Sequence, residues 1–392
     1  MKTILLNWSP ERKALLDPFI ELNKKHVVFV IVWFKNKPSY NIQCDIKQVY
    51  FSDFNSPYHL LSTINPDKIL FFNIESYYQI SLNLAAKNLG IKTFMMHHGL
   101  YQQNGMEIAS IKLKIIKENI KKSRMDFKTI LFYVFSLRLK NITTFYNYIT
   151  FAIKRRKNSS YLFFKSHNYE FLKPDIFIQL SEHNATITKK IYNLSSNERF
   201  RFIGHPFNDE FFPKLSNFEK NDKYFLLIDS HNTKNVFLIN GYTYEDKINF
   251  YKKLGYYANK NGAKLKIKLH PASYDNIENP LPKTIEFIRD SKIDALISGA
   301  LGCFAFYSTL IIPIIYHSNC CVVKTKIRYS IQEELMNLNL ITSINFFGFE
   351  ENDIYFLKSE KKSKKSISVF IKRYVYLPDG KSTERLGQIL KN

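Results

Sequence analysis

Paired histidines at the end of a predicted strand are the residues of this chain best placed to move a proton. The apolar run 91–96 ends directly in His97, His98 and Gly99. In an open α/β sheet, ligands bind beyond the carboxyl ends of the strands, and imidazole exchanges its proton near neutral pH. We expect His98 or His97 to act as a general base. Glu75, at the end of the preceding predicted strand, is an alternative base or an orienter of His98. The structural alternative is a histidine pair that only holds a loop.

The second half of the chain carries residues suited to binding an anion. His270 and Pro271 end a predicted strand, where an imidazolium could donate a hydrogen bond to a phosphate. Ser230 follows another apolar strand. We expect Ser298 and Gly299 to form a strand-to-helix turn whose hydroxyl and backbone N–H groups bind phosphate. The alternatives are a structural histidine at 270 and an ordinary tight turn at 298–299.

Strands and helices alternate along most of the chain. We expect strands at 3–8, 26–34, 45–51, 68–72, 91–96, 175–180, 199–203, 224–228, 264–269, 285–288, 295–297 and 311–316. We expect helices at 10–24, 58–64, 76–89, from 181, 244–261, up to 310, and 382–390. This alternation predicts an α/β fold with parallel sheets. A length of 392 residues favours two Rossmann-like domains, 1–220 and 221–392, facing a central cleft. The final helix is a candidate to pack back on the first domain.

A strongly basic segment interrupts the first half. Residues 111–157 hold 13 lysines and arginines but only Glu118 and Asp126 as acids, in a chain of net charge +23. Apolar and aromatic residues lie between the charges, which predicts a basic helical insertion. Its basic face is either simply solvated, or docks on an anionic inner-membrane surface or an anionic acceptor. We expect no nucleic-acid partner, because no recognised nucleic-acid-binding motif accompanies the charge.

Several function classes lack their signatures in this sequence. No Gly-x-Gly-x-x-Gly follows the first strand and no Walker A sequence is present, which argues against a dehydrogenase and a P-loop kinase. The cysteines, Cys44, Cys303, Cys320 and Cys321, lack metal-ligand spacing, and we interpret them as reduced thiols of a cytoplasmic protein. The apolar part of the N-terminus is short for a signal peptide, and no run approaches the ~20 apolar residues of a spanning helix. We therefore expect a cytoplasmic protein that is soluble or peripheral on the inner face of the plasma membrane.

The order of these motifs resembles the GT-B enzymes of bacterial surface polysaccharide synthesis. His98-Gly99, the segment 204–209 (Gly-His-Pro-Phe-Asn-Asp), His270-Pro271 and Ser298-Gly299 occur in that order. The CDP-glycerol glycerophosphotransferase family has a His-Gly pair, Gly-x-Pro-Arg-Asn-Asp, a His-Pro pair and an Asp-Tyr-Ser-Ser turn, and its ending is similar to 379–385. Bacterial sialyl- and polysialyltransferases have an acidic pair before the glycine, then a similar His-Pro and serines.

The chain also departs from both patterns. Phe207 replaces the arginine of Gly-x-Pro-Arg-Asn-Asp, and Ser298-Gly299 lacks the aspartate and paired serines of the glycerophosphotransferases. The acidic pair of the sialyltransferases is absent. Within the segment 204–209, Asn208 and Asp209 either cap the next helix or form part of the cleft floor.

This resemblance implies a division of roles between the domains. The first domain would bind the acceptor, with His98 as base and His97 as second choice. The second would bind a CMP-, CDP- or UDP-linked donor, with its phosphate held by His270 and helped by Ser298 and Gly299. No metal is implied, and no Asp-x-Asp motif is present. The implied reaction transfers a sugar, with inversion, to a hydroxyl of a growing surface glycan such as capsule or lipopolysaccharide. The alternatives are a polyol-phosphate transferase of the CDP-glycerol type and a non-catalytic, membrane-associated assembly protein.

Overall fold

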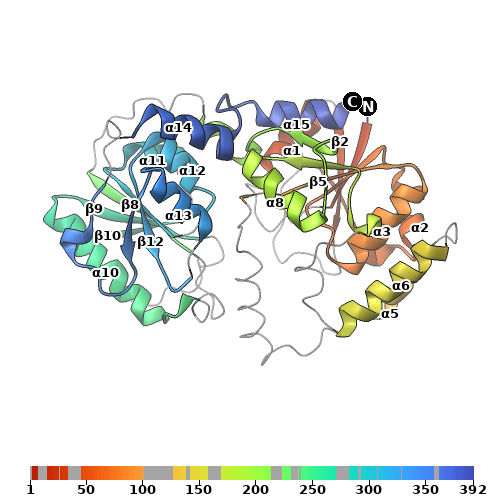
Figure 1. The fold of residues 1–392 in the computed structure, drawn as a ribbon, viewed down its shortest axis with the longest axis horizontal. Coiled ribbons are helices and arrows are strands. Elements are labelled where there is room, and N and C mark those ends of the chain that lie inside the picture. The colour runs from red at the N-terminus through yellow and green to blue at the C-terminus, as the bar shows by residue number, and fades with distance from the viewer. Residues whose placement is uncertain are drawn as a thin grey trace. The chain divides into compact units, whose positions relative to one another are not determined.

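The computed structural model divides the chain into two compact units. It describes residues 2–7, 16–25, 27–33, 46–97, 99–100, 127–137, 142–157, 169–212, 223–230, 237, 240–270, 282–289, 293–306, 308–327, 329–356 and 362–392. The first unit contains the described residues up to 100, those from 127 to 209, and those from 379 onward (Figure 1). The second contains those from 210 to 378. Each unit is an α/β layer structure of its own.

The first unit is built on a parallel sheet with the strand order β3-β2-β1-β4-β5-β6-β7. Its strands are β1 (Lys2–Asn7), β2 (Val27–Trp33), β3 (Lys47–Tyr50), β4 (Lys68–Phe71), β5 (Lys92–Met96), β6 (Ile176–Gln179) and β7 (Phe200–Phe202). Every residue of β4 and β6 is buried. Such continuous burial requires helices on both faces of the sheet, as expected for parallel strands.

Helices cover both faces of this sheet (Figure 1). They are α1 (Asp17–Lys25), α2 (Pro57–Ile64), α3 (Tyr77–Asn88), α5 (Phe127–Phe135), α6 (Ile142–Lys157), α8 (Glu182–Tyr192) and α15 (Ser382–Lys391), with short 3₁₀ turns η2 (Phe51–Asp53), η3 (Glu170–Leu172) and η4 (Pro206–Phe211). Alternate strand residues separate into two apolar cores. Leu5 and Met95 pack with the α2–α3 side, whereas Leu6 and Phe94 pack with Phe19 of α1 and Leu386 of α15.

The two helices within the basic segment pack onto α3 through aromatic side chains. Tyr133 of α5 and Tyr148 of α6 stack with ring centroids 3.8 Å apart. The Tyr148 hydroxyl lies 2.6 Å from Ser136 Oγ and 3.4 Å from Ser81 Oγ of α3, and all three residues are buried. Residues 111–126 and most of the basic side chains of 111–157 lie outside the described residues. The helices are thus observed, while the basic face of the insertion stays a prediction.

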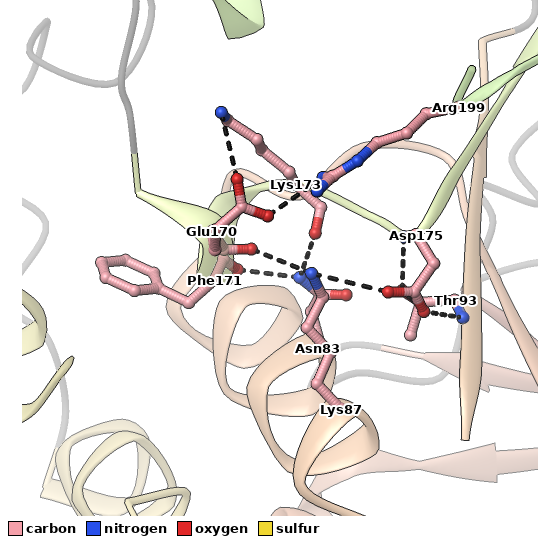
Figure 2. Close-up of polar contacts among 8 residues, drawn as sticks. All are labelled: Asn83, Lys87, Thr93, Glu170, Phe171, Lys173, Asp175 and Arg199. Carbon is pink, nitrogen blue, oxygen red and sulfur yellow. Dashed lines mark hydrogen bonds and ion pairs between the residues drawn. The ribbon is translucent and has the colours of Figure 1, made fainter. Parts of the chain in front are cut away.

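A polar cluster fixes the point where the chain re-enters the sheet after α6. Figure 2 shows Asn83 of α3 donating from Nδ2 to the carbonyl oxygens of Phe171 (2.8 Å) and Lys173 (3.1 Å). Asp175, just before β6, accepts from the backbone N–H of Thr93 (2.8 Å) and from its hydroxyl (2.9 Å). Thr93 lies near the amino end of β5. This cluster is therefore at the edge of the sheet opposite to the strand ends where ligands are expected.

The sequence motifs at 204–209 and 379–385 lie in contact with each other. The carboxylate of Asp209 accepts from the backbone N–H groups of Ser382 (3.0 Å) and Thr383 (2.7 Å), so Asp209 caps α15 rather than the helix that follows it in sequence. Arg385 donates to the carbonyl oxygen of Ile203 (2.7 Å). Gly204 has φ +91°, and a Cβ there would lie 2.5 Å from Ser382 Oγ. The first unit is therefore completed by the last residues of the chain.

We expect Asp209→Ala to destabilise this contact. The substitution leaves two N–H groups at the start of α15 without an acceptor, which costs about 0.5–2 kcal/mol for a lost N-cap. Thermal unfolding should show a lower Tm than in the wild type. Glu198→Ala, at an exposed loop residue of the same unit, is the matched control. An Asp209→Ala variant with the wild-type Tm would show that α15 does not depend on this cap.

The second unit contains a parallel sheet with the strand order β10-β9-β8-β11-β12-β13. Its strands are β8 (Tyr224–Ile228), β9 (Lys264–Lys268), β10 (Ile285–Ile288), β11 (Cys303–Ala305), β12 (Cys320–Lys324) and β13 (Thr342–Asn345). Its helices are α10 (Tyr244–Lys260), α11 (Ile293–Gly299), α12 (Ile311–His317), α13 (Ser330–Asn337) and α14 (Lys364–Phe370), the last continuing into a π-helical turn, Ile371–Val375, with a 3₁₀ turn at η6 (Glu351–Asp353). The two parallel sheets confirm the predicted α/β class. Among the described residues, no helix combines the length and apolarity needed to cross a bilayer.

Two predicted strands of the second unit are wrong. Residues 295–297 belong to α11 and residues 311–316 to α12. Short apolar runs do not distinguish a buried helix from a buried strand, and Ile311, Ile312, Ile314 and Ile315 are all buried. Pro313 lies in the first turn of α12, where a missing N–H costs little. The strands that follow these helices, β11 and β12, were not predicted.

Candidate active site

The carboxyl edge of the first sheet holds His97 and Glu75. β4 and β5 are neighbours, with Phe71 opposite Met95, so the chain leaves the sheet on adjacent strands at Phe72 and His97. The His97 ring is half-buried, with its centroid 6.0 Å from that of Phe72. Glu75 lies in the turn between β4 and α3. His98 lies outside the described residues. The structure thus places His97 and the Glu75 turn at one edge.

A buried glutamine holds the Glu75 turn in place. Gln79, in the first turn of α3, donates from Nε2 to Asn7 Oδ1 (2.8 Å) at the end of β1 and to Asn73 Oδ1 (2.7 Å) after β4. Its Oε1 accepts from the backbone N–H groups of Glu75 (3.1 Å) and Ser76 (2.9 Å). All four hydrogen-bonding positions of the amide are used in this way. Two strand ends and the loop between β4 and α3 therefore form one rigid arrangement.

A second amide holds the turn that follows the paired histidines. Asn184, buried in the first turn of α8, donates from Nδ2 to the carbonyl oxygen of Gly99 (2.9 Å). Ser181 caps the helix by accepting from the Asn184 backbone N–H at 3.3 Å. The hydrogen bond from Asn184 thus fixes Gly99 to the first turn of α8, the helix that follows β6.

The carboxyl edge of the second sheet brings Ser230 and His270 together. β8 and β9 pair with Ile228 opposite Lys268, and the Asp229 N–H donates to the Lys268 carbonyl oxygen (3.0 Å). Ser230 and His270 follow these paired residues by two positions each, and both are half-buried. Pro271 lies outside the described residues. Two side chains predicted to bind an anion therefore lie at neighbouring strand ends.

A buried ion pair lies next to Ser230. Lys247 of α10 places its ammonium 2.8 Å from Asp229 Oδ1, and both side chains have no exposed surface. The same ammonium donates to the Ser230 carbonyl oxygen (3.0 Å) and to Ser230 Oγ (3.3 Å). Burial lowers the pKa of Lys247, and the carboxylate of Asp229 opposes that shift. No sequence pattern predicts this pair, because Lys247 is one of several lysines along α10.

The predicted turn at Ser298 and Gly299 is wrong. These residues end α11 instead of starting a helix, and Ser298 Oγ donates back to the Asp294 carbonyl oxygen (2.9 Å). The Leu301 N–H donates to the carbonyl oxygen of Tyr224, the first residue of β8, so this segment lies at the amino edge of the sheet. A Cβ at Gly299 would lie 2.6 Å from Tyr224 Oη. Close packing against Tyr224, and not an anion, therefore explains this glycine.

The strand-to-helix turn at the carboxyl edge begins seven residues after Gly299, at Phe306. It follows β11 and leads into α12 through 306–310. The backbone N–H of Phe306 donates to the Ile228 carbonyl oxygen (3.2 Å), and Ser308 Oγ accepts from the Leu310 N–H (3.2 Å). Ser308 and Thr309 are half-buried. A correct placement of β11 would have identified this turn from the sequence.

No metal cluster is found in the part of the chain that the structure describes. Nowhere among those residues do three or more histidine, cysteine, aspartate or glutamate side chains form a group that could hold an ion. Cys303, Cys320 and Cys321 are buried free thiols, and burial raises the pKa of both Cys303 and Cys321 to about 12. These thiols are therefore packing residues, not nucleophiles.

Similarity to known proteins is found at the level of structure. No protein-family model and no curated protein sequence matches this chain. A glycosyltransferase of kitacinnamycin matches with a TM-score of 0.55 and 13% identity, over 100% of this chain and 98% of that one. The wall teichoic acid polymerase TagF matches with a TM-score of 0.52 and 14% identity, over 100% and 88%. This chain has the GT-B fold.

That fold is shared by enzymes of more than one kind. A putative UDP-N-acetylglucosamine 2-epimerase from Listeria monocytogenes matches with a TM-score of 0.52 and 10% identity, over 99% of this chain and 95% of that one. At such identities the similarity defines the fold. The activity has to be argued from the residues at the two sheet edges.

Proposed function

We propose that this protein is an inverting, metal-independent glycosyltransferase. It transfers a sugar from a nucleotide-activated donor to a hydroxyl of a growing surface glycan, such as capsule or lipopolysaccharide. The observation that carries the proposal is the position of Ser230 and His270 just beyond the ends of the neighbouring strands β8 and β9, at the carboxyl edge of the second sheet. A serine and a histidine at neighbouring strand ends can both donate hydrogen bonds to a phosphate. The order of motifs resembling the GT-B families supports the same assignment.

In this proposal the first unit supplies the base. His98, with His97 as second choice, removes the proton of the acceptor hydroxyl, whose oxygen attacks the anomeric carbon as the bond from that carbon to the donor phosphate breaks. The nucleotide leaves with the electron pair of the broken bond. Asn184 and Gln79 hold the turns on either side of the base at Gly99 and Glu75. Such support matters because small displacements of a reacting group cost large factors in rate.

The second unit would bind the leaving nucleotide. His270 donates to its phosphate, and as imidazolium it offsets the charge that develops there. The turn after β11, Phe306-Tyr307-Ser308-Thr309, takes the role first predicted for Ser298 and Gly299. Its sequence is similar to the Asp-Tyr-Ser-Ser turn of the glycerophosphotransferases, with phenylalanine in place of the aspartate and threonine in place of the second serine.

A thermal-shift panel tests the nucleotide-binding part of this function. We expect one of CMP, CDP and UDP to raise the Tm of the wild type, because a ligand at 100 times its Kd stabilises the folded state by about 2.7 kcal/mol. His270→Ala should lose most of that shift. His59→Ala, at an exposed histidine of the first unit, should keep it. Equal shifts in the wild type and His270→Ala would remove His270 from the binding site.

A polyol-phosphate transferase is the second candidate. The likeness to a wall teichoic acid polymerase and the turn at 306–309 favour it. In this reaction the acceptor attacks phosphorus, so CDP-glycerol would yield a glycerol-phosphate product and CMP. Sugar transfer from a UDP-linked donor would instead yield UDP. Stabilisation by CDP-glycerol and release of CMP from it would therefore select this candidate. A membrane-associated assembly protein would bind none of these donors.

We also propose an anionic membrane surface as a partner. Apolar side chains on α5 and α6 are exposed, including Phe135 (52%), Ile142 (83%), Tyr146 (68%) and Ile153 (51%). The run of cations from Lys154 to Lys157 ends α6. Exposed apolar groups beside cations are suited to the interface of an anionic bilayer.

Liposome flotation tests this partner. Replacing the four cations at 154–157 by glutamate should weaken flotation with phosphatidylglycerol vesicles, because each cation contributes about 1 kcal/mol near an anionic surface. Lys364→Glu/Lys365→Glu, at two exposed lysines of α14, is the control for charge reversal at another place on the chain. Equal flotation of the wild type and the 154–157 variant would refute the assignment of α6 as a membrane contact.

A further inference from the structure

Lys247 and Asp229 form a buried ion pair beside the end of β8, the strand that Ser230 follows. Neither side chain has exposed surface, and Nζ lies 2.8 Å from Oδ1. The rings of Phe237, Tyr251 and Phe306 surround the ammonium, with centroids 5.3–5.9 Å from Nζ. An ammonium in such surroundings requires a partner for each of its donors.

The fold alone gives no reason for charges at this position. Replacing a buried ion pair by apolar residues of similar volume is often neutral or stabilising. The aromatic rings around Nζ show that an apolar side chain would be compatible with the surroundings. Buried ionisable groups beside a strand end are candidates for a functional role.

The hydrogen bonds of the ammonium suggest what that role is. Lys247 has three N–H donors. Its ammonium forms an ion pair with Asp229 Oδ1 and donates hydrogen bonds to the Ser230 carbonyl oxygen and to Ser230 Oγ. Because Ser230 Oγ accepts from the ammonium, its own proton must point elsewhere. Tyr242 Oη lies 3.3 Å away and can act as donor or acceptor. With Tyr242 as the donor in that contact, the Ser230 hydroxyl has its own proton to donate to an anionic ligand.

We propose that Lys247 and Asp229 are positioning residues, which orient the Ser230 hydroxyl as a hydrogen-bond donor to the phosphate of the nucleotide donor. This inference rests on the proposed function. The carboxylate of Asp229 balances the ammonium, so the pair acts by fixing the geometry of Ser230 and not by adding net charge. The hydrogen bond from Lys247 Nζ to the Ser230 carbonyl oxygen fixes the backbone of the same turn.

Calorimetric titration of the full chain with CMP, CDP and UDP tests this inference. Lys247→Met/Asp229→Leu exchanges the pair for apolar residues and should stay folded. We expect it to bind the preferred nucleotide about 10- to 100-fold more weakly, the loss typical of one hydrogen bond to a charged group. Ser230→Ala, which leaves the ion pair intact, should lose about as much. Lys260→Met/Glu351→Leu, at a surface ion pair of the same unit, should bind normally.

The combined variant separates positioning from a merely structural effect. If the pair acts through Ser230, then adding Ser230→Ala to Lys247→Met/Asp229→Leu should weaken binding by no more than about twofold further. Full additivity, or normal binding by Lys247→Met/Asp229→Leu or by Ser230→Ala, would overturn the inference while the proposed function stands. Absence of binding by the wild type would overturn the proposed function and this inference with it.

Discussion

Lys247→Met alone is expected to destabilise the second unit by about 3–5 kcal/mol, the cost of leaving one charge of a buried pair without its partner. Asp229 would remain fully buried, and Ser230 would lose two hydrogen bonds at once. This loss is a large fraction of the ~5–15 kcal/mol that stabilises a whole domain. Urea unfolding, monitored by far-ultraviolet circular dichroism, measures this loss. The urea concentration at the unfolding midpoint should fall while the m value stays constant.

The double variant makes this prediction specific to charge. Lys247→Met/Asp229→Leu should recover most of the stability lost in Lys247→Met, since no unpaired charge remains. Lys260→Met, at an exposed pair, should stay close to the wild type. If Lys247→Met and the double variant lost equal stability, shape and not charge would be the cause. A Lys247→Met variant as stable as the wild type would contradict the burial of the pair.

His98→Ala is expected to lower kcat by about 10²–10⁴-fold, the range for removal of a general base. Nucleotide affinity should be unchanged, because the donor binds at the second unit in the proposed function. His97→Ala is the matched comparison at the adjacent histidine, with a smaller loss expected. Single-turnover rates and calorimetric Kd values, measured on the same preparations, separate the two effects.

The outcome of this pair of substitutions identifies the base. A large loss in His97→Ala with a small loss in His98→Ala would exchange their roles. Wild-type turnover in both variants would exclude the histidine pair and direct attention to Glu75, at the neighbouring strand end.

Sequence periodicity was sufficient to predict strands and helices that are long or have clear boundaries. The alternating run at 264–269 became β9, and the apolar run at 91–96 became β5 with His97 at its end. These two strand ends carry most of the candidate site. They were predictable because a strand that stops at a histidine or a glycine places that residue at the sheet edge.

Sequence periodicity failed to predict helices that are buried on all sides. α12 is almost entirely buried, so its isoleucines carry no polar face that would reveal a helix. The same ambiguity made 295–297 of α11 a predicted strand and Gly299 a ligand residue, whereas Gly299 packs on Tyr224. The Lys247–Asp229 pair and the Asp209 cap of α15 could not be predicted, because each joins residues that only the tertiary fold brings together.

Transfer itself is the most direct test of the central claim. The purified chain would be incubated with UDP-, CDP- and CMP-linked sugars, a hydroxyl-bearing glycan acceptor and EDTA, and both released nucleotide and extended acceptor would be quantified by mass spectrometry. We predict that one donor gives equal amounts of nucleotide and extended acceptor, with inverted anomeric configuration. Neither product from any donor, in a preparation whose fold is verified, would contradict the account.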